Sequence, residues 1–386
     1  MSTTFNVPAT IVMGAGASRE LLPQLARLGA RRVLFVTDAF MEASGLAARF
    51  VRELDEAGVA VTLFAGVQPD PTDENVREGL RAYLAGNCEA IVALGGGSPI
   101  DAAKAIAILS TNSEPLSQYQ GYHKVPRAGA PLIVIPTTAG TGSEVTKVAV
   151  ITDTARDVKM MMLDRHLLPT VALVDYELTL SMPPALTAHV GVDTLTHGIE
   201  AYVSRKATAL TDPLALTCIR LVAEHLETAW REPQNHAARE AMMLAATLGG
   251  MAFANSSVAL VHGMSRPIGA VFHVPHGLSN AMLLPVVTRF SLCGAASRYA
   301  VVARTMKLCD DRMPDVEAGS ALIAGLEQLN TRLQVPRIRE ARGVGQAAFD
   351  QALPKMAADA LASGSPANNP VIPTVDEIIR LYQEAW

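Results

Sequence analysis

The sequence lacks the excess of basic residues that marks a nucleic-acid-binding protein. Lysines and arginines number 32 against 37 aspartates and glutamates, which gives a formal net charge of −5, so nucleic acid is not expected as a partner. The first residues also lack the basic start and apolar core of a signal peptide. The four cysteines form no Cys-x-x-Cys pair, which indicates free thiols in a reducing compartment and a cytoplasmic protein.

Aromatic residues are scarce too, at 5%, whereas hydrophobic residues make up 49% of the 386 positions. This length and composition predict a well-buried, helix-rich enzyme with two domains. The stretch 242–265 carries no charged residue and is long enough to span a bilayer. It contains Gly249, Gly250, Asn255 and His262, however, so we expect a buried helix that lines a site and no membrane span.

Strand-like and helical patterns alternate up to about residue 175. Short runs of Val, Ile and Leu between helices are typical of a parallel sheet covered on both faces, and they lie at 9–12, 32–37, 60–64, 90–94 and 132–135. Met182-Pro183-Pro184 then interrupts the chain, and mostly helical spacing continues to Trp386. We therefore predict an α/β domain with a parallel, nucleotide-binding sheet over residues 1–180 and an all-helical metal-binding and catalytic domain over residues 181–386.

Histidines are concentrated in one apolar stretch. His262, His273 and His276 lie within fifteen residues, and imidazoles crowded this closely in a dry setting favour metal ligation. Asp193 and His197 are four residues apart, which places both side chains on one face of a helix, where they can share an ion. Each histidine taken alone is better explained as a hydrogen-bonded core residue. The two groups together favour a metal site.

Two glycine-rich loops could hold a phosphate. The Gly-Ala-Gly loop at 14–16 lacks the third glycine of the dinucleotide fingerprint, so we interpret it as a turn. The loop at 95–99 leaves a buried strand and enters a helix, with Ser98 as the expected N-cap and Pro99 at the first position. Its glycines let a pyrophosphate approach the free N–H groups and the positive end of the helix. A plain tight turn is the alternative, but it does not need three consecutive glycines.

A third polar loop, at 136–146, reads Pro-Thr-Thr-Ala-Gly-Thr-Gly-Ser-Glu-Val-Thr. It follows a predicted parallel strand, and open α/β sheets bind ligands at the carboxyl ends of their strands. The density of hydroxyls and glycines is unremarkable in a generic loop. At this position it predicts a nucleotide contact.

Four motifs carry a resemblance to a known family: Gly95-Gly96-Gly97-Ser98-Pro99, Pro136-Thr137-Thr138-Ala139-Gly140-Thr141, Gly191-Val192-Asp193 with His197, and His262 with Pro275-His276-Gly277. Over essentially its whole length the chain resembles the iron-dependent (group III) alcohol dehydrogenases, and it is similar to their lactaldehyde reductase (1,2-propanediol oxidoreductase) branch. The resemblance implies the dehydroquinate synthase-like fold of that family, a homodimer, and a metal held by Asp193, His197, His262 and His276.

The resemblance also implies which residues contact NAD. Asp38 matches an acidic residue at the ribose, and Lys159 matches a lysine near the cofactor ribose. Asp70 stands where relatives often have asparagine, which leaves its role open. Phe253 matches an aromatic residue that closes over the substrate. Gly96, Gly97 and Ser98 match the loop that binds the diphosphate. Thr137 and Thr138 match the loop near the nicotinamide.

The implied ligand set is chemically consistent with alcohol oxidation. Three neutral imidazoles and one carboxylate leave a divalent ion with net positive charge, which suits a Lewis acid acting on an alcohol or carbonyl oxygen. Such ligands accept Fe(II), Zn(II), Ni(II) or Mn(II), so the choice of Fe(II) rests on the resemblance. Hydride transfer would be the chemistry of the bound NAD.

One residue departs from the family pattern. Many relatives have a second histidine four residues after the ligand at His262, where this chain has Arg266. Arginine is not a general base at neutral pH, although it binds carboxylates bidentately. Solvent or His273 would then have to move the proton. The alternative is that Arg266 faces a structural carboxylate.

The sequence therefore predicts an NAD(H)-linked alcohol dehydrogenase or aldehyde reductase for a small primary alcohol or its aldehyde, and Arg266 suggests a substrate that carries an anionic group. One alternative is other chemistry on the same scaffold, either a hydroxyacid–oxoacid transhydrogenase or a dehydroquinate-synthase-like lyase. The lyase would need a basic pocket, and the sequence offers no such cluster. Another alternative is a non-catalytic metal- or nucleotide-binding protein, which the intact ligand set and cofactor loop disfavour.

Overall fold

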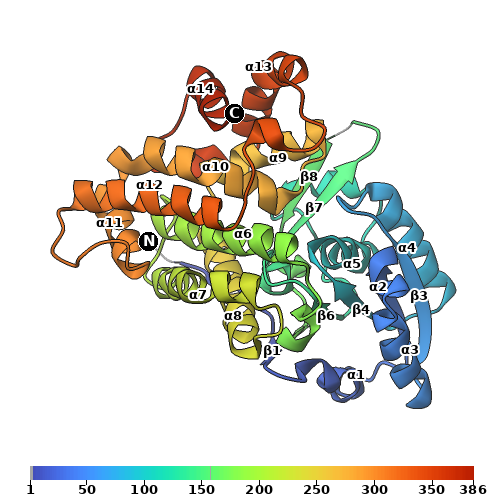
Figure 1. Cartoon of the computed structure of the whole chain (residues 1–386). Coiled ribbons are helices and arrows are strands. Elements are labelled where there is room, and N and C mark those ends of the chain that lie inside the picture. Colours follow the sequence, from blue (N-terminus) through green and yellow to red (C-terminus); the bar gives the residue numbers. More distant parts are fainter. Residues whose placement is uncertain (1–2, 157) are drawn as a thin grey trace. The chain divides into compact units, whose positions relative to one another are not determined.

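The computed structural model describes residues 3–156 and 158–386, and the chain forms two compact units (Figure 1). One unit is Asn6–Leu180, and the other is Ser181–Trp386 together with the described residues before Asn6. The first contains the strands and α1 to α5, and the second contains α6 to α14. The predicted fold class, an α/β unit followed by a helical one, is confirmed.

A six-stranded parallel sheet forms the centre of the first unit, in the order β1-β9-β6-β4-β2-β3. Strands β4 and β6 are buried at every residue, as expected of a sheet covered on both faces. The strands are β1 (Thr10–Met13), β2 (Arg32–Asp38), β3 (Ala60–Val67), β4 (Ala90–Gly95), β6 (Leu132–Pro136) and β9 (Val171–Val174).

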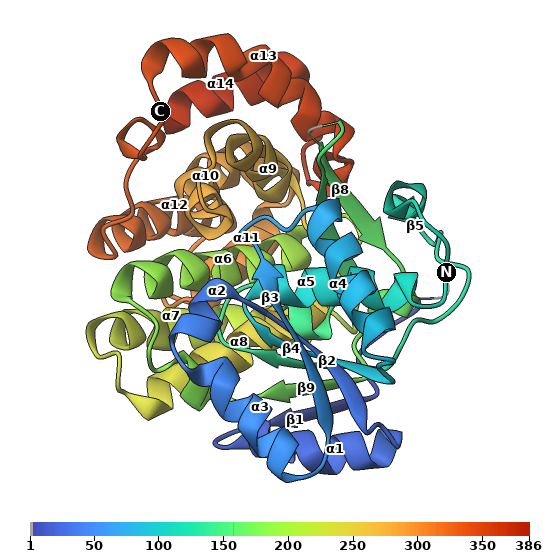
Figure 2. The ribbon, with the colours of Figure 1, turned by 90° about the vertical axis from the view of Figure 1, so that its right-hand side faces the viewer.

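Helices cover both faces of this sheet, with α1 and α3 on one side of the strands and α5 on the other (Figure 2). On the first side, Leu25 and Phe50 pack with Phe35 and Val92 in one apolar cluster. The helices of the unit are α1 (Leu21–Leu28), α2 (Ala39–Ala43), α3 (Leu46–Glu56), α4 (Asp73–Ala85) and α5 (Gly97–Leu109).

Two features of this unit differ from the sequence predictions. Helix α5 begins at Gly97 with Gly96 as N-cap, so the prediction of Ser98 as N-cap was wrong. Gly95 has φ +146, a conformation open to glycine, and this turns the chain into the helix early. A second sheet in the order β5-β8-β7 was not predicted; it consists of β5 (Gly121–Tyr122), β7 (Val148–Asp153) and β8 (Val158–Leu163).

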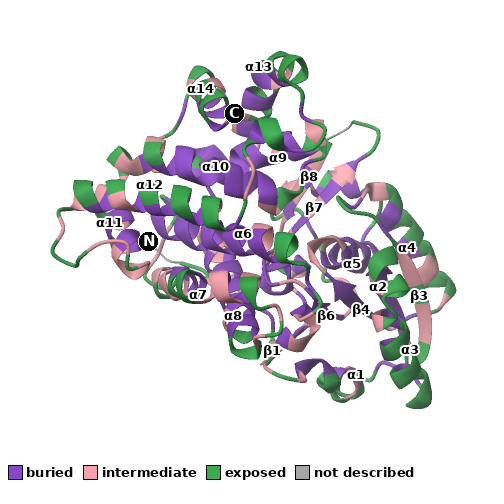
Figure 3. Ribbon diagram, in the orientation of Figure 1, coloured by how far each residue is buried: buried purple, intermediate pink, exposed green. Residues whose placement is uncertain are grey.

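The second unit is helical. Its α6 and α10 are buried over most of their length (Figure 3). Gly191 lets α7 approach α6, because a Cβ there would lie 2.2 Å from Cδ1 of Leu226. The helices are α6 (Pro184–Val203), α7 (Asp212–Arg231), α8 (His236–Asn255), α9 (Leu260–Phe272), α10 (His276–Ser291), α11 (Ala296–Thr305), α12 (Asp315–Arg332), α13 (Gln346–Ala362) and α14 (Val375–Ala385).

Among the described residues, no single helix has the length and apolar character needed to cross a membrane. Helices α8 and α9 meet that test only as a pair, and they are bent by 103° at the break between them.

Candidate functional site

Helix α6 carries three ionisable side chains on one face. Pro183 precedes the helix and Pro184 occupies its first position, where a missing N–H costs nothing. Asp193, His197 and Glu200 follow at positions i, i+4 and i+7, which lie on one helical face. Their side chains are at most 4% exposed. Glu200 was not predicted as a site residue, although its spacing continues the pattern that singled out the other two.

The Glu200 carboxylate joins α6 to the start of α9. It accepts hydrogen bonds from the backbone N–H groups of Ala259 (2.8 Å) and Val261 (2.6 Å), and it lies 2.6 Å from Nδ1 of His262. Helix α9 has no side-chain cap of its own sequence, so this carboxylate satisfies N–H groups at the helix start. The bond to Nδ1 fixes the imidazole with the lone pair of Nε2 facing away from Glu200.

Helix α10 begins with His276. The next residue, Gly277, permits a close approach to α6, because a Cβ there would lie 2.8 Å from the carbonyl oxygen of His189. The His276 side chain is 41% exposed, whereas those of Asp193 and His262 are 2% and 4% exposed. The group is therefore accessible from the side of His276.

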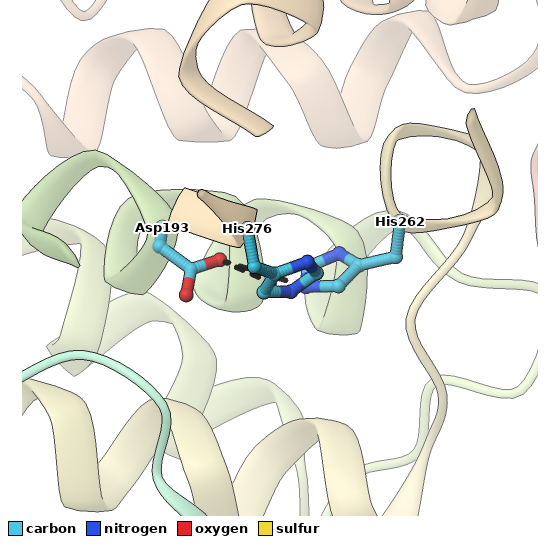
Figure 4. A group of neighbouring side chains, drawn as sticks. All are labelled: Asp193, His262 and His276. Carbon is cyan, nitrogen blue, oxygen red and sulfur yellow. Dashed lines mark ion pairs between the residues drawn. The ribbon is translucent and has the colours of Figure 1, made fainter. Parts of the chain in front are cut away.

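These three helices bring the predicted metal ligands together (Figure 4). One ligand atom each from Asp193, His262 and His276 lies within 4.8 Å of the other two. Oδ1 of Asp193 is 3.6 Å from Nε2 of His262 and 4.0 Å from Nε2 of His276. His197 adjoins the group, since its Nε2 is 3.8 Å from the same carboxylate oxygen and its ring stacks on that of His262, with centroids 4.7 Å apart.

His197 is held by packing and not by a hydrogen bond. Its ring stacks against Phe253, the predicted substrate-pocket residue, with centroids 4.4 Å apart and planes at 23°. Its Nδ1 is buried and finds no hydrogen-bond partner within the described part of the chain. His262, with its bond to Glu200, is the more firmly oriented imidazole.

Burial dominates the ionisation of the group. It lowers the pKa of His262 well below the ordinary value, and the neighbouring His197 and His276 act in the same direction. Burial raises the pKa of Glu200 to about 7, against the effect of its backbone N–H donors. For Asp193 burial alone would raise the pKa, but the imidazoles and a bond from Asn280 outweigh it and keep the pKa low. The group thus presents a carboxylate and a neutral imidazole at neutral pH.

This donor set fits a divalent metal ion. One carboxylate oxygen and imidazole nitrogens, without thiolate, suit Fe(II) and its divalent neighbours. The carboxylate behind His262 is the outer support that metal-bound histidines usually have.

Asn280, four residues after His276 on α10, was also missed by the sequence analysis. Its Nδ2 donates to Oδ1 of Asp193 at 2.6 Å and lies 3.2 Å from Nε2 of both His262 and His276.

Two further predicted residues lie on or next to α9. Arg266 is on the helix one turn after His262, and its Nη1 donates to Oγ of Ser365 at 2.8 Å. His273 is the C-cap of α9 in a left-handed conformation, with φ +54, and it is exposed. The charge of Arg266 acts on His262, because, in addition to burial, it contributes to lowering the pKa of that imidazole.

Several of the predicted nucleotide contacts lie at one edge of the six-stranded sheet, whereas Lys159 lies on β8 of the smaller sheet. Strand β4 lies between β2 and β6. The direction in which successive strands are added reverses between β2 and β4, because β3 is added on one side of β2 whereas β4 and then β6 are added on the other side. Ligands of open α/β sheets bind at the carboxyl ends of strands next to such a reversal. Asp38 ends β2, Gly96 follows β4, and Thr137 follows β6.

The loops at this edge fit a dinucleotide. Gly97 is close to the neighbouring loop, since a Cβ there would lie 3.0 Å from Cγ2 of Thr141, and a Cβ at Gly96 would lie 3.4 Å from Oγ1 of Thr138. The backbone of the α5 N-terminus is thus free of side chains, as a diphosphate requires. Oγ1 of Thr137 is buried, and no residue of 3–156 or 158–386 forms a hydrogen bond with it.

Asp38 also has a structural part, because its Oδ1 accepts from the backbone N–H of Met41 at 2.8 Å and caps α2. Lys159 and Asp70, both predicted cofactor contacts, bind each other with Nζ and Oδ1 2.7 Å apart. Asp70 has φ +56, a conformation that aspartate and asparagine tolerate better than most residues.

The glycine loop at 14–16 is a turn, as predicted. Its N–H groups are used within the unit: Gly16 N and Ser18 N donate to Oδ1 and Oδ2 of Asp175 at 3.1 and 3.2 Å. A carboxylate of the protein itself therefore occupies the position in which a phosphate would be expected.

A buried lysine, also unpredicted, connects α5 with the loop after β6. Nζ of Lys104 donates to Oγ of Ser143 (2.9 Å), Oγ1 of Thr146 (3.0 Å) and the carbonyl of Val148 (2.7 Å). Asp101 accepts from the Ser143 hydroxyl at 2.6 Å. Burial lowers the pKa of Lys104 to about 8, although Asp101 acts against it.

An α/β unit with a glycine-rich loop at the carboxyl end of β4 and a helical unit with a buried carboxylate–imidazole group are the features of a metal-dependent, nucleotide-linked oxidoreductase. Two family models match the chain, "Iron-containing alcohol dehydrogenase" over residues 8–176 and "Fe-containing alcohol dehydrogenase family, C-terminal" over residues 187–386. The chain therefore belongs to the iron-containing alcohol dehydrogenase family, as its motifs predicted.

Relatives of known activity match over nearly the full chain. The NAD-dependent methanol dehydrogenase of Bacillus methanolicus is 37% identical over 99% of this chain and 100% of its own. The lactaldehyde reductase of Escherichia coli (strain K12) is 37% identical over 98% of each. A crystal structure of 1,3-propanediol oxidoreductase superposes with a TM-score of 0.96 at 35% identity, covering 100% of both chains. The enzyme class, an iron-containing NAD-dependent alcohol dehydrogenase, follows from these matches.

Proposed function

We propose that the enzyme interconverts a small primary alcohol and its aldehyde with NAD(H), using a metal held by Asp193, His197, His262 and His276. The observation that carries the proposal is the convergence of Asp193, His262 and His276 ligand atoms within 4.8 Å, at an otherwise buried position that opens beside His276. The named activities of the relatives, on methanol, lactaldehyde and 1,3-propanediol, support a small substrate.

The side chains around this group have distinct parts in the reaction. When bound, the metal would polarise the substrate oxygen and NAD would exchange the hydride. Glu200 orients His262 and keeps its Nε2 free of a proton. Phe253 packs on His197 and limits how far that ring can turn. Asp193 is the anionic ligand, and its low pKa keeps it ionised.

The proposed cofactor contacts all belong to the first unit. Asp38 would accept hydrogen bonds from the adenosine ribose hydroxyls, and the N-terminus of α5, with Gly96, Gly97 and Ser98, would bind the diphosphate. Thr137 and Thr138 would lie at the nicotinamide, as the resemblance implies. The Asp70–Lys159 pair would face the cofactor ribose through Lys159. The resemblance also supports a homodimer in the cytoplasm.

The proposed proton route differs from that of the relatives. Arg266 retains its charge at neutral pH and does not accept a proton, so solvent or His273 serves as the base. His273 is exposed at the end of α9, where exchange with water is direct.

The test is a scan of primary alcohols and aldehydes with NAD(H), using metal-stripped full-length protein with and without added Fe(II) or Zn(II). We expect metal-dependent reduction of small aldehydes with NADH. Activity that needs no metal would contradict the proposed ligands. Turnover of a hydroxyacid with an oxoacid without added NAD, by protein that keeps its cofactor through gel filtration, would favour a transhydrogenase instead.

A further inference from the structure

Asn280 has an amide nitrogen at the centre of the proposed metal ligands. Nδ2 lies 2.6 Å from Oδ1 of Asp193 and 3.2 Å from Nε2 of His262 and of His276. These are the three residues whose ligand atoms lie within 4.8 Å of one another. The Asn280 side chain is fully buried.

The orientation of this amide follows from Asp193. A carbonyl oxygen 2.6 Å from a carboxylate oxygen would be repelled, so the NH₂ group must face the ligands. The nitrogen donates to the carboxylate and lies within hydrogen-bond distance of Nε2 of both imidazoles. For His262, the bond of Nδ1 to Glu200 leaves Nε2 as the acceptor. The same three atoms would be the first partners of a metal ion.

The other end of the amide is unsatisfied. Oδ1 of Asn280 is buried and has no hydrogen-bond partner among the residues that the structure describes, which is a costly arrangement for an amide. The three acceptors therefore hold the amide in this orientation. A cation held by the same three atoms would compete with Nδ2 for them, so metal binding would require the amide to give up these contacts.

We propose that Asn280 is a positioning residue that stands in for the cation in the metal-free enzyme. Its Nδ2 group contacts the carboxylate oxygen of Asp193 and Nε2 of His262 and His276, which are the atoms that would hold the metal, so the metal must displace it. This inference rests on the proposed metal site and goes beyond it, because it states that Asn280 weakens metal binding while it stabilises the metal-free protein.

The sign of the effect separates this proposal from a merely structural role. Removing the donors raises the free energy of the metal-free state and leaves the metal-bound state without its competitor, so metal should bind more tightly. A residue that only supports the fold would destabilise both states equally and leave the affinity unchanged. A residue that supports the bound metal would, when removed, weaken the affinity.

The experiment compares wild type with Asn280→Leu and Asn280→Ala, as metal-stripped full-length protein. Leucine keeps most of the volume and removes both donors, so it guards against a failure of alanine to fold. Zn(II) affinity is measured by competition with a chromogenic chelator, and thermal unfolding is measured without metal. Asn330→Leu is the matched control. Asn330 lies on α12, and its Nδ2 donates to the backbone carbonyl of Ala281 on α10, the helix that carries Asn280, and not to a proposed ligand.

We expect both variants to unfold at lower temperature without metal and to bind Zn(II) roughly tenfold or more tightly, since a hydrogen bond to a charged group is being removed from the competing state. Unchanged or weaker Zn(II) binding in both variants would overturn the role of Asn280. If wild type itself binds no stoichiometric Zn(II), the proposed metal site fails together with this inference, so the two failures are distinguishable.

Discussion

Nδ1 of His262 and Oε2 of Glu200 are 2.6 Å apart, and the same carboxylate accepts two backbone N–H groups at the start of α9. One buried side chain of α6 thus sets both the position of α9 and the orientation of the ligand that α9 carries. The loss of such a support behind a metal-bound histidine usually weakens metal binding.

We therefore expect Glu200→Gln to lower metal affinity by about 10- to 100-fold, because glutamine is neutral and supports Nδ1–H less strongly. Metal content after dialysis against a chelator measures this. Glu224→Gln, which changes an exposed carboxylate of α7, should leave affinity unchanged. Equal metal affinity in wild type and Glu200→Gln would show that Glu200 only binds the backbone N–H groups at the start of α9 and does not support the ligand His262.

His197→Ala and His276→Ala should each abolish activity without loss of the fold, since removal of one ligand of four disrupts both occupancy and geometry. NADH fluorescence should still report binding in both variants, because the proposed cofactor contacts are elsewhere in the chain. His236→Ala, an exposed histidine of α8, is the control. Full metal content and activity in both ligand variants would refute the assignment.

The Asp38 carboxylate should select NAD(H) over NADP(H) by repelling a 2′-phosphate. Asp38→Gly and Asp38→Asn should both shift the ratio of kcat/KM for the two cofactors toward NADP(H), by about tenfold for each 1.4 kcal/mol of repulsion removed. Asparagine keeps an acceptor for Met41 N and glycine is tolerated at an N-cap, so the comparison separates charge from helix capping. A wild type that uses both cofactors equally well would contradict the assignment.

Arg266 lies one turn from His262, and we predict that its charge favours substrates with an anionic group. A charge-assisted contact with a carboxylate is worth roughly 1.5–3 kcal/mol, so kcat/KM for succinic semialdehyde should exceed that for butanal about ten- to a hundredfold. Arg266→His should remove the preference, and Ser365→Ala, which releases Nη1, should keep it. If wild type shows no preference, the bond to Ser365 defines Arg266 as structural.

The Lys104 network predicts a pH dependence of stability. Burial lowers the pKa of Lys104 from 10.5 to about 8, so between these values only the unfolded chain holds the proton. The free energy of unfolding should therefore rise with pH through this window relative to Lys104→Met, by at most about 1.4 kcal/mol per pH unit. Urea denaturation at pH 7.5 and 9.5 measures the effect, with the exposed Lys124→Met as control. If the free energy of unfolding changed with pH by the same amount in wild type and in Lys104→Met, the lowered pKa of Lys104 would be contradicted.

The sequence predicted the fold class because each central strand is a continuous apolar run, and the runs at 32–37, 90–94 and 132–135 are β2, β4 and β6. The small sheet of β5, β7 and β8 was not predicted. Strand β5 has only two residues and therefore no pattern to read, whereas the alternation in the six-residue β7 was a signal that the sequence analysis missed. The N-cap of α5 was wrongly predicted at Ser98, because a helix that follows glycines can begin without a side-chain cap.

The crowded histidines and the i, i+4 spacing of Asp193 and His197 indicated a metal site, and the family resemblance then supplied the set of four candidate ligands. Glu200 and Asn280 were not, since a glutamate or an asparagine on a helix is common. The role of Glu200 depends on where α9 starts, and the role of Asn280 depends on how α10 packs against α6. That packing requires Gly277 next to the carbonyl of His189. Such contacts between distant segments leave no local pattern.

The separation of the proposed sites between two compact units has a thermodynamic consequence. A ligand raises the stability of the state that binds it, so metal would protect the unit Ser181–Trp386 against heat, and NADH would protect the unit Asn6–Leu180. Where the two units melt as separate transitions, each ligand would move only one of them. Calorimetry could then identify which half of the chain a destabilising substitution has damaged without any measurement of catalysis.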